Sequence, residues 1–395
     1  MREWKPLPSA TKKSLLSTAF LTFSCLLGID IHTPSLPSMV TFFQTNNDML
    51  QYAITLFVFG AGLGIFVWGP EADRYGRKPI ITLGASIVIL SAIAATTTTS
   101  IHIFLFLRLL QGIGSGALMC LCRVIAADLL NRKQLANIGA SVGLITGMAP
   151  MLAPIIGGYI EEHIGWHGSF IAYAFFCSIG LWVFLINYEE SLKEKVVNTH
   201  IIQNYMQIFR KKNFLFLALL QGVILSVLNC YAVVAPFLVQ NEIGLSPVWF
   251  GWLCGLCSVS QLTSKICSPS FIRRFGAYRV HRIGWVLLLS SALLLMSRTQ
   301  VPGHNIALFI GSIALAFFSI HMIIPFLFTE AMSLSASGKG ILGAGFSSTA
   351  MLISALVSKS ISAIPYEGSG LLASCYFVLA MIGLLMSRSL KPAEE

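Results

Sequence analysis

The chain has 395 residues, of which 55% are hydrophobic and only 11% are charged. Soluble proteins average about 25% charged residues, so too few polar side chains are present to cover a water-soluble globule of this size. A net charge of +10 would suggest nucleic-acid binding in a soluble protein. Here the basic residues gather in every second connection between apolar segments, which is a topology signal, so composition predicts a protein of the lipid bilayer and argues against nucleic-acid binding.

Twelve apolar segments are each long enough to cross the bilayer core, which takes about 20 helical residues. They are too long and too evenly apolar for the short alternating strands of a membrane barrel. The predicted fold is an all-α polytopic membrane protein with twelve transmembrane helices in two parallel six-helix repeats. The predicted spans are 14–37, 49–70, 79–98, 101–124, 136–160, 166–187, 213–239, 246–268, 281–297, 304–329, 340–363 and 369–388.

Charged residues between the spans predict the orientation. Arg2, Lys5, Lys12 and Lys13 precede the first span, and similar basic groups follow the second, fourth, sixth, eighth and tenth. The alternate connections carry almost none. Because basic loops stay in the cytoplasm, both termini are predicted to be cytoplasmic.

A charged connection at 188–212 divides the chain into an N-terminal bundle (1–187) and a C-terminal bundle (213–395), with 188–212 as a cytoplasmic linker. The loop after the second span of each half reads Arg-aromatic-Gly, as DRYGRK at 73–78 and RRFGAYR at 273–279. The offset of 200 residues and the matching loop position predict two parallel repeats, an architecture used by transporters.

The first of these loops reads GPEADRYGRKP at 69–79. Gly76 suits a tight turn, and Gly69 permits close helix approach. Asp73 can accept hydrogen bonds from backbone N–H groups at a neighbouring helix N-terminus. Arg74 and Arg77 are expected to hold the loop at the cytoplasmic face.

The fourth span begins RLLQGIGSGALMC at Arg108. Arg108, Gln111, Ser115 and Met119 recur at helical spacing and share one face. Gly112 and Gly116 form a GxxxG pair, which lets another helix approach closely.

The fifth span reads GLITGMAPMLAPIIGGYI. Its glycines and prolines form one helical stripe, and two prolines on such a stripe predict a kinked helix with a bare contact face. A helix that must rock against its neighbour would use this surface. The predicted conformational residues here are Gly143, Gly147, Pro150, Pro154, Gly157 and Gly158.

These three motifs, each in its appropriate span, resemble those of the major facilitator superfamily, and the fifth span is similar to that of the bicyclomycin-resistance type of drug:proton antiporter. Glu71 departs from the pattern, which usually has an apolar residue there. The resemblance implies twelve helices around a central cavity with alternating access, a bacterial inner (cytoplasmic) membrane, and an Arg108 that supports proton coupling. Arg123 and Asp128 look like the Arg…Asp pair of these antiporters, and by that resemblance Arg123 is expected to pair with Asp73.

Asp30 is an isolated acid in the outer half of the first span, at a depth similar to that of Arg108. An apolar cavity disfavours the charged carboxylate and a nearby cation favours it, so such a group can load and lose a proton. Asp30 is therefore predicted to carry the proton and Arg108 to tune it. Two alternatives stay open, because Asp30 can instead be an interfacial polar residue and Arg108 can be a structural residue that bonds helix carbonyls.

Polar side chains inside the spans are candidates for the substrate cavity, since such residues tend to face the bundle interior. Lys265, near the inner end of the eighth span, is expected to snorkel to the interface. His32 is expected to face away from Asp30. The cavity candidates are Thr22, Gln111, Ser115, Met119, Gln221, Asn229, Tyr231 and Gln261.

The predicted function is a secondary transporter that exports a small organic compound, a drug or metabolite, by antiport with protons. The alternatives are a proton-coupled importer or a siderophore or metabolite transporter of the same fold, and a non-transporting membrane receptor or scaffold. No catalytic nucleophile–base pair, cofactor motif or metal cluster is recognisable, and all nine cysteines lie in predicted spans. Cys254 and Cys257 form a CxxC, but it lies inside an apolar span, where small packing residues are expected rather than metal or redox chemistry. The protein is thus not expected to be an enzyme or to carry a cofactor or metal, and is expected to be a monomer.

Overall fold

The computed structural model of the chain describes residues 7–131, 134, 143–192, 201–298, 306–334, 339–364 and 368–390. All regular structure within these residues is helical. The helices are α1 (Ser9–Asp30), η1 (Thr33–Ser35), α2 (Leu36–Phe42), α3 (Asn47–Tyr75), α4 (Arg77–Thr97), α5 (Ile101–Leu129), α7 (Ala149–His163), α8 (Trp166–Asn187), α9 (Ile201–Phe209), α10 (Lys212–Phe237), η2 (Leu238–Glu242), α11 (Pro247–Phe275), α12 (Ala277–Arg298), α13 (Ile306–Ser333), α14 (Lys339–Ser362) and α15 (Gly368–Ser387).

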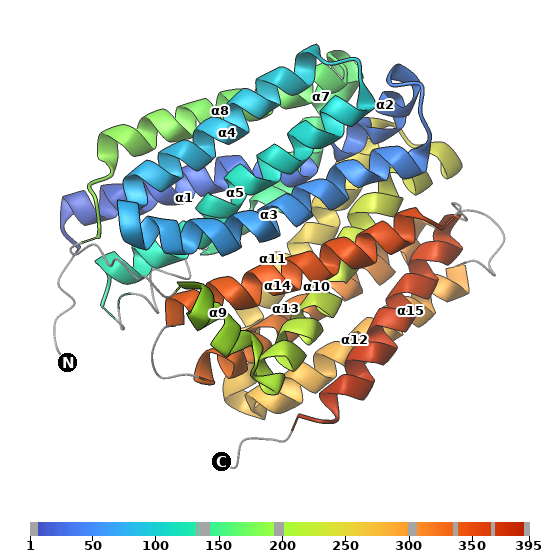
Figure 1. Cartoon of the computed structure of the whole chain (residues 1–395). Helices are drawn as coiled ribbons and strands as arrows, with labels where there is room; N and C mark the ends of the chain where they lie inside the picture. The colour runs from blue at the N-terminus through green and yellow to red at the C-terminus, as the bar shows by residue number, and fades with distance from the viewer. Residues whose placement is uncertain are drawn as a thin grey trace.

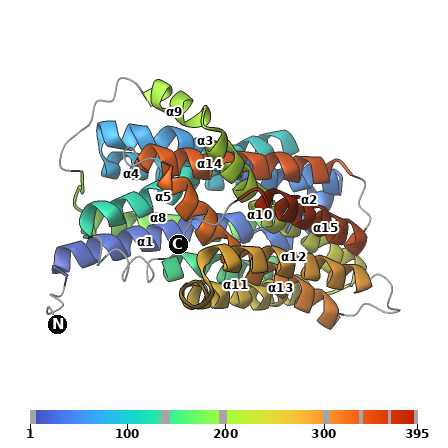
Figure 2. The same ribbon diagram turned by 90° about the horizontal axis from the view of Figure 1, so that it is seen from below.

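The helices form two bundles with nearly parallel long axes (Figure 1). Helices α1 to α8 make the upper bundle in that view and α10 to α15 the lower one, while the short α9 lies at the outer edge of the bundles, packed against α14 and α10 (Figure 2). Ten of the described helical segments are long and apolar enough to cross a membrane. The predicted span 246–268 lies almost wholly within α11, and the predicted span 136–160 overlaps α7 from residue 149 onward; residues 136–142 lie outside the described residues.

The first span is broken at Asp30. Pro34 has no backbone N–H to bond the Asp30 carbonyl, so the α-helix ends there, and the Thr33 hydroxyl donates to that carbonyl at 2.7 Å instead. The chain continues through η1 and α2 to Phe42. This span therefore extends beyond the predicted 14–37, and Asp30 lies about 18 Å from the end of α2 at 1.5 Å per residue.

Two equivalent turns confirm the repeat seen in the sequence. Gly76 is the single residue between α3 and α4, and Gly276 is the single residue between α11 and α12. Their φ angles are 110° and 83°. Only glycine adopts such angles readily, which explains the Arg-aromatic-Gly signature in each half.

Helices α3 and α5 pack backbone to backbone. A Cβ at Gly112 would collide with the Phe57 carbonyl, and one at Gly116 would collide with the Ala61 carbonyl. On the facing helix, Gly60 and Gly64 are equally crowded by α5. The predicted GxxxG contact is therefore present, and it brings Arg108, one turn above Gly112, close to α3.

The two ends of the molecule differ. Helices α3, α5, α8 and α11 end at what is here called the basic end, which carries Arg74, Arg77 and Arg273. At the opposite end the halves touch, because Gln240 Nε2 donates to the Pro34 carbonyl at 3.0 Å and the Thr55 and Ser358 hydroxyls lie 2.8 Å apart. The opposite end of the interface is therefore closed in this structure.

Substituting Gly112 by alanine should destabilise the protein by about 1–3 kcal/mol, since the added methyl group overpacks the α3–α5 contact. The measurement is the thermal unfolding midpoint of the purified protein in detergent. Gly311→Ala is the matched control, because Gly311 is also inside a helix but has open space where a Cβ would be. Equal midpoints for the two variants would contradict the close α3–α5 packing.

Candidate functional site

A cavity of about 180 Å³ lies between the two halves. Helices α1, α3 and α7 line it from one side, and α10, α11, α13 and α14 from the other. Among the described residues that line it, Asp30 is the only charged one. Three of the predicted cavity residues, Asn229, Tyr231 and Gln261, also lie in this lining.

Arg108 lies behind Asp30 in the interior of the N-terminal bundle, with no exposed surface. Its guanidinium donates to the Gly28 carbonyl at 3.2 Å, to the Ala53 carbonyl at 3.3 Å and to Gln111 Oε1. It also lies over the rings of Phe57 and Phe170. The alternative that Arg108 bonds helix carbonyls is thus what the structure shows.

Arg108 and Asp30 are not paired directly, because both ion pairs in the described part of the chain belong to Arg77. Arg108 is near enough for its charge to act on the carboxylate. The Gly28 carbonyl that it binds is two residues before Asp30, in the last turn of α1, where helix carbonyls lack intrahelical partners. Arg108 therefore holds the broken end of α1 in place.

The other predicted cavity residues are not in the lining. Gln111 is taken up by Arg108, Ser115 lies 3.3 Å from the Tyr173 hydroxyl, and Thr22 donates to the Thr18 carbonyl at 2.8 Å. Met119 and the buried Gln221 also lie outside it. The polar face of α5 packs against α1, α3 and α8, so the polar contacts of that face stay inside the N-terminal half.

Neighbouring polar side chains in the C-terminal wall bond one another. Asn229 Nδ2 donates to Ser354 Oγ at 2.5 Å, and the Tyr231 hydroxyl lies 3.2 Å from Cys254 Sγ. The sequence reading missed Ser354, Cys254 and Ser258. The helical spacing of Phe250, Cys254, Ser258 and Gln261 on α11 was the signal that could have found the last two.

Helix α7 lines the cavity and contacts both α1 of the N-terminal half and α11 of the C-terminal half. Pro154 has no N–H for the Pro150 carbonyl, and Ser258 of α11 donates to that carbonyl at 3.2 Å. A Cβ at Gly157 would collide with the Ile31 carbonyl of the α1 break, and one at Gly158 with the Pro247 carbonyl of α11. The predicted stripe is thus a close contact surface between α1 and α11, although Gly143 has open space around it.

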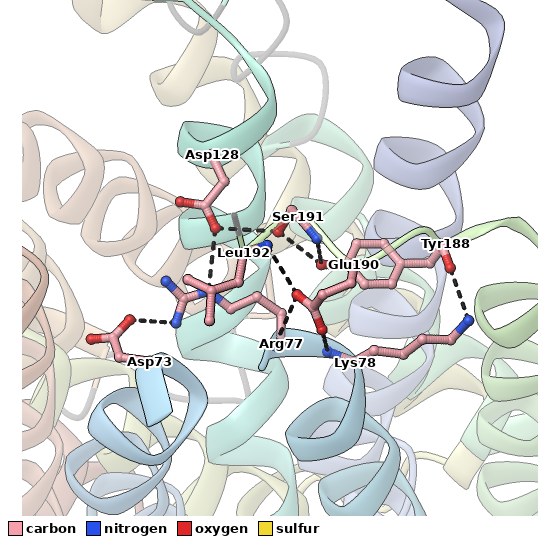
Figure 3. A network of polar contacts seen from close by, with 8 residues as sticks. All are labelled: Asp73, Arg77, Lys78, Asp128, Tyr188, Glu190, Ser191 and Leu192. Atoms are coloured by element: carbon pink, nitrogen blue, oxygen red, sulfur yellow. Dashed lines mark hydrogen bonds and ion pairs between the residues drawn. The ribbon is translucent and has the colours of Figure 1, made fainter. Parts of the chain in front are cut away.

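At the basic end, Arg77 joins the ends of α3 and α5 (Figure 3). Its guanidinium pairs with Asp73 at 2.5 Å and with Asp128 at 3.2 Å. Ser191 also donates to Asp128 at 3.2 Å. The expectation that Arg123 pairs with Asp73 is wrong, because Arg77 occupies that position and the Arg123 guanidinium lies 5.9 Å from the ring centre of Phe328 instead.

Glu190 performs the role that the sequence reading gave to Asp73. Its carboxylate accepts from the backbone N–H of Arg77 at 3.1 Å and of Lys78 at 2.9 Å, the first two residues of α4 (Figure 3). A carboxylate there also complements the helix dipole. The segment after α8 thus caps α4, and the sequence pattern alone did not reveal a bond across 113 residues.

Lys78 and Tyr188 complete this set of residues, here called the latch: Asp73, Arg77, Lys78, Asp128, Tyr188, Glu190 and Ser191. Lys78 Nζ donates to the Tyr188 carbonyl at 3.0 Å. Burial raises the pKa of the Tyr188 phenol to about 12, so it stays a neutral partner of Ser191 at physiological pH. Arg74 is exposed and lies outside the latch, over the Tyr75 ring.

Helix α9 lies between the two halves near the basic end. Tyr205 is 3% exposed, and its hydroxyl donates at 3.3 Å to the Phe66 carbonyl, which Pro70 leaves without its helical donor. Burial raises the pKa of Tyr205 above its ordinary value, so it remains a donor. Aromatic ring contacts continue from Phe66 to Phe328 of the C-terminal half, through Tyr205, Phe209, Phe214 and Phe346. The Arg123 guanidinium of the N-terminal half lies over the Phe328 ring.

Two bundles around a central cavity, with matching turns between their second and third spans, define a polytopic transporter fold. Residues 18–313 match the Major Facilitator Superfamily. The chain therefore belongs to the major facilitator superfamily of multi-pass membrane transporters, and these proteins are not enzymes.

Several bacterial resistance proteins are similar to this chain. It is 26% identical to a bicyclomycin resistance protein homolog of Haemophilus influenzae, over 71% of this chain and 72% of the relative. It is 23% identical to multidrug resistance protein D of Escherichia coli, over 90% and 89%. The chloramphenicol resistance protein CraA of Acinetobacter baumannii is 22% identical, over 84% and 81%.

Solved structures share the fold at low sequence identity. A D-xylose-proton symporter superimposes with a TM-score of 0.81 at 16% identity, covering 97% of this chain and 98% of the other. The nucleoside transporter NupG superimposes with a TM-score of 0.76 at 13% identity, covering 96% of this chain and 98% of the other.

Replacing Glu190 by glutamine should lower stability by about 0.5–2 kcal/mol, the usual contribution of a helix cap. The readout is again the thermal unfolding midpoint in detergent. Glu189→Gln is the matched control, because both side chains are exposed but it is the Glu190 carboxylate that bonds the first two residues of α4. If both variants behave alike, Glu190 does not stabilise α4.

Replacing Tyr205 by phenylalanine should loosen the basic end, because the Phe66 carbonyl loses its donor at a cost of about 1 kcal/mol. That corresponds to about a fivefold larger equilibrium constant for local opening at this contact. Cys120, half-buried nearby on α5, should react correspondingly faster with a maleimide, as located by mass spectrometry. Tyr159→Phe, which removes a hydroxyl bonded to Trp252 at the opposite end, should leave that rate unchanged.

Proposed function

We propose that this transporter exports a small organic compound in exchange for protons, with Asp30 as the proton carrier. The observation that carries the proposal is the position of Asp30, the one charged side chain among the described residues lining the cavity, at the break of α1. Ionisable residues inside a membrane protein are rare and costly, and mark ion or substrate pathways. The resistance proteins among the relatives support export of organic compounds.

The surroundings of Asp30 have opposite effects on the ionisation of its carboxyl group. The apolar lining and the negative end of the α1 dipole disfavour a charged carboxylate, while the charge of Arg108 favours it. Because Arg108 is held by two carbonyls and Gln111 rather than by Asp30, the carboxyl group can change its protonation without breaking an ion pair. This arrangement suits a group that takes up a proton from one side and releases it to the other.

Alternating access would move the two halves, residues 1–187 and 213–395, about the cavity. The bare face of α7 lies where such a motion needs it, against the α1 break on one side and α11 on the other. The latch would stiffen the N-terminal half, and α9 would hold the basic end. We place this end, with both termini, in the cytoplasm of a bacterial inner membrane, and propose that a monomer suffices because one chain supplies both cavity walls.

Asp30→Asn keeps the size of the side chain but cannot exchange a proton, so proton-driven transport should fall at least tenfold. The measurement is substrate-dependent proton release in proteoliposomes with an imposed pH gradient, using chloramphenicol, bicyclomycin and a metabolite panel. Asp48→Asn at the start of α3 is the control and should keep wild-type coupling.

Unchanged proton coupling in Asp30→Asn would overturn the assignment of Asp30. If substrate and protons cross the membrane in the same direction, the protein is a symporter, and the importer alternative replaces proton-coupled export. A wild-type protein that moves no compound of the panel under any gradient would favour a receptor or scaffold.

A further inference from the structure

Lys265, which the sequence analysis expects to snorkel to the interface, lies 10 residues before the end of α11 at Phe275, about 15 Å along the helix. Its side chain faces the other half of the protein instead. A Cβ at Gly147, in the stripe of the fifth span, would lie 2.9 Å from Lys265 Nζ.

Lys265 continues the cavity-lining face of α11. Cys254, Ser258 and Gln261 line the cavity, and Lys265 follows Gln261 by one helical turn toward the basic end. On α13, His321 follows the lining residue Phe317 by the same step. Lys265 is near enough to His321 for its charge to act on the ring.

Lys265 has no carboxylate partner among the described residues, where both ion pairs belong to Arg77. A neighbouring buried atom, Gln261 Oε1, also lacks a hydrogen-bond partner in the described chain. An unpaired ammonium group inside a membrane protein is costly unless an anion reaches it. The amide and the imidazole beside it can each turn a donor toward such an anion.

We propose that Lys265, with Gln261 and His321, forms an anion subsite at the basic end of the cavity, and that the transported compounds include small organic anions with an apolar body. The anionic group, a carboxylate or a phosphate, would bind Lys265, and the apolar body would lie along Phe317 and the rest of the lining. This proposal adds a substrate class to the proposed transport function, and the statement that these anions are transported rests on that function. The binding site itself does not depend on proton coupling.

The subsite lies apart from Asp30. Asp30 is close enough to Cys254 for its charge to act on the thiol. Lys265 follows Cys254 by 11 residues, which is about 16 Å along α11. Lys265 therefore lies well away from Asp30, one helical turn beyond the lining residue Gln261. An anion at Lys265 avoids most of the repulsion from Asp30, and leaves Asp30 free to exchange its proton.

The test compares three ligands in titration calorimetry with the purified protein in detergent: 4-phenylbutyrate, its primary amide and phenyl phosphate. The wild-type protein should bind at least one of the two anions ten or more times tighter than the amide. Lys265→Gln should lose this preference while binding the amide as the wild type does, which shows that the variant is folded. Lys265→Arg should retain the preference.

Lys359→Gln is the matched control, because Lys359 also belongs to a spanning helix but is exposed, and it should bind all three ligands like the wild type. A preference for the phosphate over the carboxylate, or the reverse, identifies the anion. The proposal is overturned if neither anion binds the wild type better than the amide, or if Lys265→Gln keeps the preference. Because no proton gradient is present, failure of Asp30-dependent antiport would leave this result unaffected.

Discussion

Inside a bilayer every backbone carbonyl must find a donor within the protein, and the central features of this structure follow from that constraint. Three prolines each leave one helix carbonyl without its donor, and a side chain supplies the missing hydrogen bond. At the α1 break the donor is Thr33, at α7 it is Ser258, and at α3 it is Tyr205. Ser258 belongs to the C-terminal half and Tyr205 to the linker helix α9, so the same hydrogen bonds that satisfy the backbone also join separate parts of the chain.

A related constraint applies to the charged side chains, because removing a charge from water costs free energy unless a partner compensates for it. Arg108 satisfies carbonyls at the broken end of α1, and Arg77 joins two carboxylates in the latch. Asp30 and Lys265 have no such partner among the described residues, and both lie on the faces that meet at the cavity. Arg108 and Arg77 thus have hydrogen-bond or ionic partners, whereas the two charges without such a partner are the ones for which we propose proton transfer and ligand binding.

Much of the fold could be predicted before the structure, because helix periodicity and basic loops are local signals. The glycine turns at Gly76 and Gly276, the GxxxG contact at Gly112 and the place of Asp30 in the cavity wall were all accessible this way. The failures have two causes. Gln111 and Ser115 were assigned to the cavity because they share a polar face, but periodicity does not say which helix that face meets. Arg123 was paired with Asp73 by family resemblance, which does not say which basic side chain lies closer in this chain.

The membrane class, the helical periodicity, the repeat and the family resemblance follow from the amino-acid sequence alone, since each depends on residue type and spacing along the chain. The partner of each polar group depends on the three-dimensional packing of the helices. Glu190 caps α4 from 113 residues away, Ser258 bonds Pro150 across the two halves, and Lys265 faces Gly147 rather than the membrane surface. Such pairings depend on the rotation and crossing of helices, which side-chain packing sets only once the bundles have assembled.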